Sequence, residues 1–503
     1  MPNEIKIGAR IKNVHFLFRY LSQHNFFNCH LSHLYMPSPT LTPDQRQTLA
    51  HIVGSSYVQF DALDDYSHDW TEDLRFYPQA VVQPRTTEEV SRLMRYCYEE
   101  NIPVTPRGAG TGLSGGALPV RGGVVLSIAR MNEIVAIDEE NLQVVTQPGV
   151  ITQHLQESVA RKGLFYPPDP SSKGSCLIGG NVAENAGGPK AVKYGVTQDY
   201  VLNLEVVLAD GTVIWTGANV LKNATGFNLT QLMVGSEGTL GVVTQMVLKL
   251  IPMPQHRLLM KASFADPADA CRAVAAIFRS GRVPSALEFM EKSGLEYAAQ
   301  YLGQDRTWPP EAAAQLLIEV EGNHLDALYA DCELIDAVLQ QHGVLENLFA
   351  ETVKEQEELW RLRRIMGEAV HAISTYKEED TVVPRARLAD LLQTVKAIGA
   401  RYGFESVCYG HAGDGNLHVN ILKGRMDEQA WNETVKHGIR EIFQQVVAMG
   451  GTLSGEHGIG WVQREYMDIA FSERSMELMR GIKALFDPKG TLNPDKIFPS
   501  EQD

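Results

Sequence analysis

Positive charge, long apolar runs and cysteine are all scarce in this 503-residue sequence. Its 45 Lys and Arg residues stand against 61 Asp and Glu residues, which gives a net charge of −16. That balance argues against a nucleic-acid-binding protein, because such proteins neutralise phosphates with basic side chains. No apolar run reaches the roughly 18 residues of a membrane-spanning helix. A chain of this length is expected to fold as two or three globular domains.

Cysteine is rare and irregularly spaced. The six cysteines are Cys29, Cys97, Cys176, Cys271, Cys332 and Cys408. Because no two form a C-x-x-C pair, this chain alone is not expected to hold an iron–sulfur cluster. The pattern is typical of reduced thiols. We therefore expect a cytoplasmic location, with peripheral association with the inner membrane as an alternative.

The beginning of the chain carries weak signals. Four basic residues and one acidic residue precede Met36, as in a targeting sequence. The first helix-start pattern comes later, at Thr42-Pro43-Asp44-Gln45, where a capping residue precedes a proline. We expect residues 1–40 to be a poorly ordered N-terminal extension, with a targeting segment as the alternative.

Glycine is concentrated in a few places, most densely from Pro106 to Ala117, where five of twelve residues are glycine. Glycine permits positive φ and close approach of backbone N–H groups to an anion, so this loop predicts a phosphate cradle. Gly110 to Gly115 formally matches the dinucleotide pattern G-x-G-x-x-G. In a Rossmann fold a helix begins at that pattern, whereas here Gly122-Gly123 and an apolar strand follow. We therefore expect a phosphate-binding loop set among strands.

Two further glycine-rich runs follow, from Gly174 to Gly188 and from Gly235 to Gly241. A flexible linker would be more polar than the first of these runs, which contains Leu177, Ile178 and Val182. We expect its backbone to lie against a flat ligand.

The pattern changes after Pro252-Met253-Pro254, which is typical of a linker. Amphipathic helices are predicted at residues 267–279, 326–341 and 353–373, and they alternate with strand-like runs such as 316–320. This alternation predicts a second α+β domain, with antiparallel strands covered by helices.

Histidine gathers late in the chain, in two Gly-rich segments. The first runs from His411 to Asn420 and contains His418; the second is Ser454-Gly-Glu-His-Gly. A turn at Gly413-Asp414-Gly415 would bring His411 and His418 together. Two imidazoles and a carboxylate from separate loops suit a divalent transition metal with open positions for a substrate.

The three glycine-rich runs, in this order, resemble the FAD domain of the vanillyl-alcohol oxidase and p-cresol methylhydroxylase superfamily. The resemblance implies an α+β fold, with a two-part FAD-binding domain and a substrate or cap domain that has an antiparallel sheet. It implies an FAD-binding domain at residues 41–252, a substrate domain carrying the metal site at 253–455 and a C-terminal segment, 456–503, that returns to the FAD domain. The first loop lacks histidine, and Cys176 is the one candidate for covalent attachment in the second run, so we expect non-covalent FAD.

By the same resemblance, FAD is held by residues of the three runs, by one proline ahead of the second run and by one asparagine near the C-terminus. These residues are Pro106, Arg107, Gly108, Ala109, Gly110, Thr111, Gly112, Ser114, Gly115, Gly116, Pro168, Ser175, Gly180, Asn181, Asn185, Gly187, Glu237, Gly238, Val243 and Asn493.

The histidine segments are similar to those of the branch that contains D-lactate dehydrogenases, the glycolate oxidase flavin subunit and D-2-hydroxyglutarate dehydrogenase. The resemblance implies a divalent metal, zinc with manganese, cobalt or iron as alternatives, held by His411, His418 and Glu456. It implies that His457 takes the hydroxyl proton while hydride passes to flavin N5. It further implies that Asn420 contacts the substrate and that Arg363 binds its carboxylate, although the arginines at 361–364 also fit a solvated helix face.

Two departures bear on the substrate. Gly367 stands where the hydroxyglutarate enzymes have threonine, and Lys377 or Glu378 stands near the position of their lysine. We therefore favour an FAD-dependent dehydrogenase that oxidises D-lactate or glycolate to the 2-oxo acid. D-2-hydroxyglutarate is an alternative because of Lys377.

A second alternative is a flavin-bearing subunit of a multi-subunit glycolate oxidase, acting as a scaffold or electron relay. The expected partners are a small 2-hydroxy acid and an electron acceptor, which is a quinone, a cytochrome, an electron-transfer flavoprotein or an iron–sulfur subunit. A homodimer is an alternative to a monomer, because the sequence does not determine the oligomeric state.

Overall fold

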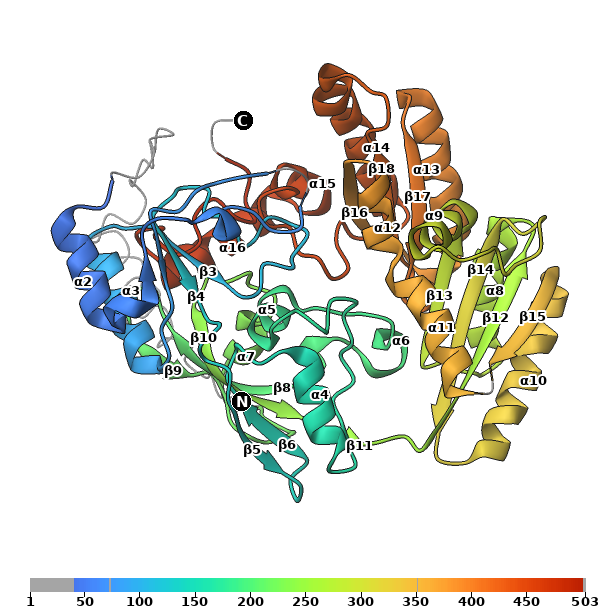
Figure 1. Cartoon of the computed structure of the whole chain (residues 1–503), viewed down its shortest axis with the longest axis horizontal. Coiled ribbons are helices and arrows are strands. Elements are labelled where there is room, and N and C mark those ends of the chain that lie inside the picture. The colour runs from blue at the N-terminus through green and yellow to red at the C-terminus, as the bar shows by residue number, and fades with distance from the viewer. Residues whose placement is uncertain (1–39, 72–73, 351, 501–503) are drawn as a thin grey trace, which may run out of the picture. The chain divides into compact units, whose positions relative to one another are not determined.

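The structure of this chain is a computed structural model that describes residues 40–71, 74–350 and 352–500 (Figure 1). The N-terminal extension expected at residues 1–40 lies outside the described residues, apart from its last position. In the described ranges no helix combines the length and the hydropathy that crossing a bilayer requires. Three principal sheets and their helices form the α+β fold that the sequence predicts.

The first sheet lies near the start of the described chain and has the order β1-β2-β4-β3. Its strands are β1 (Val58–Gln59), β2 (Ala80–Val82), β3 (Val104–Arg107) and β4 (Val124–Ser127). Helices α2 (Pro43–Val53) and α3 (Thr87–Glu99) share its apolar core. The predicted start of α2 is confirmed, since the Thr42 side chain accepts the Gln45 backbone N–H in a capping box. Strand β3 leads directly into the first glycine loop.

The second sheet is antiparallel and has the order β5-β6-β10-β8-β9. Its strands are β5 (Ile134–Asp138), β6 (Gln143–Thr146), β8 (Val201–Val207), β9 (Val213–Trp215) and β10 (Val242–Lys249). Two short strands, β7 (Leu164–Phe165) and β11 (Ile251–Pro252), form a separate antiparallel sheet. Four short helices belong to the connecting segments: α4 (Thr152–Ala160), α5 (Ile178–Glu184), α6 (Ala191–Tyr194) and α7 (Leu229–Met233).

The third sheet contains seven antiparallel strands in the order β15-β12-β14-β13-β17-β18-β16. These are β12 (His256–Phe264), β13 (Ala286–Glu291), β14 (Ala314–Gly322), β15 (Val344–Ala350), β16 (Tyr376–Val382), β17 (Glu405–Gly410) and β18 (Asn416–Leu422). The seven helices around it are α8 (Pro267–Arg279), α9 (Lys292–Leu302), α10 (Leu325–Gln341), α11 (Val353–Arg364), α12 (Met366–Ile373), α13 (Leu388–Tyr402) and α14 (Val435–Ala448).

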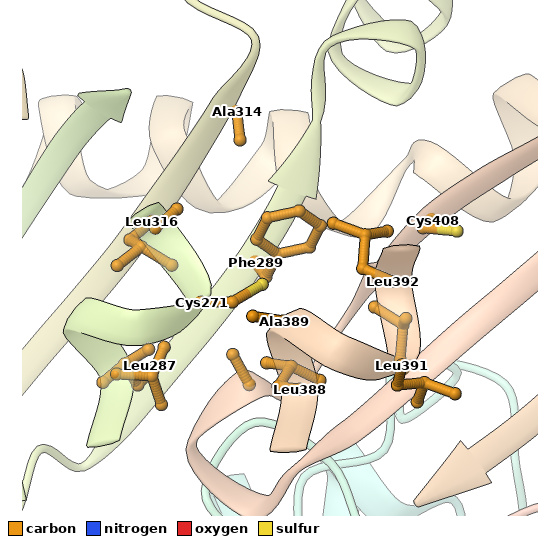
Figure 2. Close-up of a cluster of buried hydrophobic side chains, with 14 of the residues drawn as sticks. Cys271, Leu287, Phe289, Ala314, Leu316, Leu388, Ala389, Leu391, Leu392 and Cys408 are labelled. Carbon is orange, nitrogen blue, oxygen red and sulfur yellow. The ribbon is translucent and has the colours of Figure 1, made fainter. Parts of the chain in front are cut away.

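Both faces of this sheet are covered, which explains why its strands are apolar over most of their length. One face packs against α8, α10, α13 and α14, and Figure 1 shows α13 and α14 side by side. Figure 2 shows the centre of this layer, where Phe289 of β13 lies between Cys271 of α8 and Leu392 of α13. The opposite face packs against α9, α11 and α12. Because side chains alternate along a strand, β12, β13 and β17 contribute residues to both layers.

One predicted helix is interrupted. The sequence predicts a single helix over 353–373, but α11 ends at Arg364 and α12 begins at Met366, with Ile365 between them. The last turn of α11 buries Leu362 and Arg363. The break therefore lies next to the arginine that the sequence assigns to the substrate carboxylate.

The C-terminal segment contacts the first sheet. After α15 (Met467–Ala470) and α16 (Glu473–Phe486), Leu492 forms an isolated parallel bridge with Val104. The next residue, Asn493, donates its side-chain amide to the backbone oxygens of Gly116 and Glu237 at 3.1 and 2.7 Å. The end of the described chain thus joins the first and third glycine-rich segments.

Candidate active site

A cavity of about 520 Å³ is lined by residues from widely separated parts of the sequence. The glycine-rich segments contribute to its wall, with Gly108, Gly180 and Gly238 among the lining residues. Arg363, His418 and residues 456–457 line the same cavity. Of the residues predicted to bind FAD, fourteen line the cavity: Pro106, Arg107, Gly108, Ala109, Gly110, Thr111, Gly112, Gly116, Ser175, Gly180, Asn181, Glu237, Gly238 and Val243.

The other six residues predicted to bind FAD are not part of this cavity wall. They are Ser114, Gly115, Pro168, Asn185, Gly187 and Asn493. Several of them support neighbouring segments instead: the Ser114 backbone oxygen accepts N–H groups from Trp461 and Val462, and Asn185 caps α5 with φ of 55°. A Cβ at Gly187 would lie 2.9 Å from Glu456 Oε2, so this glycine permits close approach to the histidine segment.

The glycines of the first two runs leave space in the cavity. Among the described residues, a Cβ at Gly112 or Gly180 would meet no atom within 4 Å, although both positions line the wall. These glycines therefore keep cavity volume free for a ligand, as a site for FAD requires. Gly110 has a different role, because its φ is 72° and a Cβ there would lie 2.2 Å from Arg107 Nη2.

Arg107 and Glu237 both hold segments of the chain in place. The Arg107 guanidinium donates to the backbone oxygens of Asp65 and His68 at 3.0 and 2.7 Å. The Glu237 carboxylate accepts the backbone N–H groups of Ile459 and Gly460 at 2.8 and 2.6 Å, and burial raises its pKa to about 7. The third glycine-rich segment is thus tied to the loop that follows His457.

The second glycine run has a conformation that the sequence did not predict. Residues 178–184 form the short helix α5, although two consecutive glycines disfavour a helix. A Cβ at Gly179 would lie 2.6 Å from Pro148 Cβ, so packing against the preceding turn requires glycine. Asn181 is buried and donates to Thr152 Oγ1 at 2.7 Å. Cys176 lines the cavity, and burial raises the pKa of its thiol.

The predicted turn at Gly413–Gly415 brings two histidines together. His411 follows β17, His418 lies in β18, and their ring centres are 5.3 Å apart. The Glu456 Oε1 atom lies 3.2 Å from His411 Nε2, 3.6 Å from His418 Nε2 and 3.7 Å from His457 Nε2. Three imidazoles therefore face one carboxylate oxygen.

This donor set fits a divalent ion. Two ligands bound to one Zn²⁺ at about 2.1 Å each lie at most about 4.2 Å apart, and the distances from Glu456 to His411 and His418 fall below that limit. Burial and His457 lower the pKa of His418 to about 3, which keeps this imidazole in the neutral form that binds metals. Glu378, His418 and His457 form a second group of donors within 4.8 Å of one another.

Glu288 is a site residue that the sequence analysis missed. It lies in β13, is fully buried, and both of its oxygens are 2.9 Å from His411 Nδ1. Its Oε2 is also 2.7 Å from Arg363 Nη2. Burial alone would lower the pKa of His411, but Glu288 and Glu456 raise it to about 10. The available signal was an acidic residue between Leu287 and Phe289 in an apolar strand.

Asp380 was missed as well, and it holds the second histidine segment. Its Oδ2 accepts the backbone N–H groups of Gly455, Glu456 and His457 at 2.8, 2.7 and 2.9 Å. The Ser454 hydroxyl donates to the same oxygen at 2.8 Å. The acidic run ahead of Pro384 was the available signal in the sequence.

The other two predicted catalytic residues differ in position. Arg363 lines the cavity, is 3% exposed and lies 5.1 Å from the Tyr409 ring centre. Its Nε has no hydrogen-bond partner in the described part of the chain, so it is available to a carboxylate. Arg361 and Arg364 are exposed, as the alternative of a solvated helix face predicts. Asn420 is fully buried and is not part of the cavity wall.

Two family models match the chain. The model described as FAD binding domain matches residues 78–217, and the model described as FAD linked oxidases, C-terminal domain, matches residues 253–497. Glycolate oxidase subunit GlcD of Bacillus subtilis (strain 168) is 38% identical over 469 residues, which cover 92% of this chain and 98% of that protein.

Two other relatives are similar over their length. D-lactate dehydrogenase of Anaerostipes hadrus is 36% identical, covering 91% of this chain and 98% of that protein. D-2-hydroxyglutarate dehydrogenase of Stutzerimonas stutzeri (strain A1501) is 33% identical, and the match covers 92% of this chain and 100% of that protein. The solved structure of p-cresol methylhydroxylase with substrate bound shares the fold, with a TM-score of 0.75, 18% identity and coverage of 91% of this chain and 96% of that chain.

Proposed function

Because this chain belongs to the FAD-linked oxidases and is an FAD-dependent oxidoreductase of hydroxy acids, we propose that it is a D-2-hydroxy-acid dehydrogenase. D-lactate and glycolate are the favoured substrates. The observation that carries this proposal is that Arg363, His418, Glu456 and His457 line the same cavity as the glycine-rich segments.

Each polar group in this wall has a task in such a reaction. The guanidinium of Arg363 binds the substrate carboxylate, which a planar donor pair suits. His457 takes the hydroxyl proton; Glu456 lies 3.7 Å from its imidazole Nε2, and Asp380 accepts its backbone N–H. His411 and His418, with Glu456, would hold a divalent ion. When bound, FAD supplies a hydride acceptor and the ion supplies a Lewis acid for the hydroxyl group.

We also propose that FAD binds without a covalent bond. The Cys176 thiol is held in its neutral form by burial and lies 3.3 Å from Thr152 Oγ1, so it is a poor nucleophile toward the flavin. Acid precipitation of the yellow protein should therefore release all flavin into the supernatant. Flavin that stayed with the precipitate would contradict this proposal.

We propose three parts, of which the boundary at 252/253 coincides with the start of the C-terminal family model, while the boundary at 455/456 lies inside that model. Residues 41–252 would form the FAD-binding domain, 253–455 the substrate domain, and 456–503 a segment that returns to the first. The contacts of Leu492 and Asn493 with Val104, Gly116 and Glu237 support this division.

Anaerobic reduction of the flavin tests the proposed activity. D-lactate, L-lactate, glycolate and D-2-hydroxyglutarate are each added to the purified protein, before and after metal removal with a chelator. We expect bleaching by a D-2-hydroxy acid and by glycolate, and slower bleaching after metal removal. Bleaching by L-lactate alone would overturn the proposed stereochemistry, and unchanged bleaching after verified metal removal would overturn the role of the ion.

A second candidate is a subunit that relays electrons within a multi-subunit oxidase. The similarity to GlcD of Bacillus subtilis, which is named as a subunit, favours it. This candidate predicts no flavin bleaching by any hydroxy acid in the purified chain, and bleaching once partner subunits are added.

A further inference from the structure

Glu378 is a carboxylate in the cavity wall that the proposed reaction does not use. It lies in β16, and Tyr376 and Asp380 share its face of the strand. Its side chain is 9% exposed, and its Oε1 is 3.4 Å from His418 Nδ1. The Tyr376 hydroxyl is hydrogen-bonded to it. This carboxylate therefore faces the space beside the proposed reacting centre.

The cations of the cavity wall have other partners. In the described chain this wall contains three arginines. Arg107 donates to backbone oxygens, Arg363 is bound to Glu288, and Arg364 lies half-exposed 4.0 Å from Asp169. None of the ion pairs in the described chain joins an arginine to Glu378, and the imidazole 3.4 Å from it, that of His418, is held neutral by a lowered pKa.

Lys377 is the residue that made a dicarboxylate substrate an alternative in the sequence analysis. It lies on the other face of β16. Its Nζ is 4.7 Å from the ring centre of Trp431, a residue of the core that covers the opposite face of the sheet. Lys377 is not part of this cavity wall. Gly367, which stands where the hydroxyglutarate enzymes have threonine, lines the wall without a side chain.

We propose that Glu378 determines substrate specificity: the site accepts 2-hydroxy acids with a single carboxylate, prefers a neutral or hydrogen-bond-donating group beyond the hydroxyl-bearing carbon, and rejects a second carboxylate. This inference rests on the proposed function, because it concerns the same site.

The physical reason is repulsion between like charges in a buried place. Glu378 and Glu456 already put two carboxyl groups in this wall, and Glu456 is stabilised by its contact with His411. A second substrate carboxylate beside Glu378 would place two like charges together in a buried site, and no arginine of the wall forms an ion pair with Glu378 that would offset them. A hydroxyl group could instead donate a hydrogen bond to Glu378.

A different role is suggested by the group that Glu378 forms with His418 and His457, since these donors could hold an ion. That role and the specificity role make opposite predictions for Glu378→Gln. Loss of a metal ligand would lower the bound metal per flavin, whereas loss of a repulsive charge would leave it unchanged. We expect unchanged metal content.

Ligand binding to the oxidised, FAD- and metal-loaded protein tests the proposal without turnover. Pyruvate and 2-oxoglutarate are titrated against wild type, Glu378→Gln and Glu378→Lys, and the change in the flavin absorption spectrum reports binding. We expect wild type to bind pyruvate at least about tenfold more tightly than 2-oxoglutarate, a factor that corresponds to one pKa unit. Glu378→Gln should narrow this ratio at least about threefold, and Glu378→Lys should reverse it.

Glu368→Gln is the matched control, because Glu368 lines the cavity but is exposed, where water and salt screen its charge. It should keep the wild-type ratio. Equal binding of both ligands by wild type, an unchanged ratio in Glu378→Gln, no binding of either ligand by any form, or loss of metal from Glu378→Gln would each overturn the proposal. If pyruvate binds with the expected preference but no hydroxy acid bleaches the flavin, the proposed activity fails while the role of Glu378 stands.

Discussion

Glu288 contacts two residues with different proposed tasks. It accepts a hydrogen bond from His411 Nδ1, so Nε2 is the nitrogen of that imidazole that faces Glu456. Its other contact is the ion pair with Arg363. The carboxylate is fully buried, so neither partner can be replaced by bulk water. The orientations of an ion ligand and of the carboxylate-binding arginine therefore depend on one side chain.

We predict that Glu288→Gln lowers the affinity for the divalent ion by about 10- to 100-fold, because the imidazole loses its charged partner. The measurement is metal content after dialysis against graded concentrations of a chelator. Glu291→Gln, in the same strand, is the matched control, since Glu291 binds Lys396 and the Cys408 backbone N–H. If both variants retained the ion as wild type does, Glu288 would have no role in positioning.

Lys496 makes stability depend on pH. It is 3% exposed, donates to the Leu118 backbone oxygen at 2.7 Å, and burial lowers its pKa from 10.5 to about 7. Between these two values the unfolded chain binds more protons at this residue than the native protein. The free energy of unfolding should therefore rise with pH, by up to about 1.4 kcal/mol per pH unit from this group.

We predict that Lys496→Met removes this increase, because methionine has no proton to release. Urea unfolding at pH 7 and pH 9 measures it in wild type and variant. Lys489→Met changes an exposed lysine of the same segment and should leave the wild-type increase in place. An equal increase in wild type and Lys496→Met would show that other groups produce the pH dependence.

At the residue scale the sequence predicted groups that stand in conspicuous local patterns, such as His411, His418 and Glu456. Glu288 is 123 residues from His411 along the chain and stands alone in an apolar strand. Only the pairing of β13 with β17 brings them together. No local spacing records that contact, so sequence patterns could not assign Glu288 to the site.

The loop at residues 454–458 is held in place by hydrogen bonds to a side chain of another element, strand β16. Three consecutive backbone N–H groups, from Gly455 to His457, point to one oxygen of Asp380. The loop thus takes its shape from β16, and the two site residues it carries, Glu456 and His457, are placed by a carboxylate that does not line the cavity.

We predict that Asp380→Asn destabilises the protein by about 1–3 kcal/mol, since an amide presents one acceptor oxygen where the carboxylate presents two. Hydrogen exchange at Gly455, Glu456 and His457 should become faster. Ser454→Ala is the control: it removes one donor to Asp380 and should leave the three amides protected. Exchange that is equally slow in Asp380→Asn would mean that other contacts fix the loop.

At the element scale the sequence predicted the start of α2 and the helices α8 and α10, because capping residues and apolar periodicity are local. It predicted neither helix α5 nor the break between α11 and α12. Gly179 permits α5 by its contact with Pro148, a tertiary effect that outweighs helix propensity. Helical periodicity continues past Ile365, since Met366, Ala369 and Val370 remain buried, so the pattern contained no sign of the break.

On the scale of the whole molecule, one lysine joins the glycine-rich part of the chain to the seven-stranded sheet. Lys190 is hydrogen-bonded to Glu319 and lies 2.7 Å from Glu321, both in β14. Glu319 also accepts the indole N–H of Trp360 at 3.1 Å. Trp360 belongs to α11, the helix that carries Arg363, so this network connects both parts of the proposed site.

We predict that Lys190→Met lowers the free energy of unfolding by about 3–5 kcal/mol, because two buried carboxylates lose their cation. Urea unfolding measures the loss. Lys162→Met is the control: its ion pair with Glu139 is half-exposed on both sides and contributes about 0–1 kcal/mol. Equal losses in the two variants would contradict the importance of the buried pair.

The family assignment from the sequence is confirmed, because three glycine-rich runs in a fixed order are a property of the whole chain. The contacts between the glycine-rich part of the chain and the seven-stranded sheet could not be predicted in this way. Lys190 and Glu319 are 129 residues apart, and nothing near either residue identifies the other. Fold and family were therefore predictable from the sequence, whereas the side-chain contacts between the glycine-rich part and the seven-stranded sheet became visible only in the structure.

The contact between Asn493 and Gly116 sets an order of events during synthesis. The two residues are 377 positions apart, and ribosomes add about 5–20 residues per second, so roughly 20–75 s pass between the appearance of the glycine loop and that of its last partner. A nascent chain displays this loop before Asn493 exists to brace it. Stable cofactor loading should accordingly follow completion of the chain, and full-length protein made without flavin should accumulate as apoprotein.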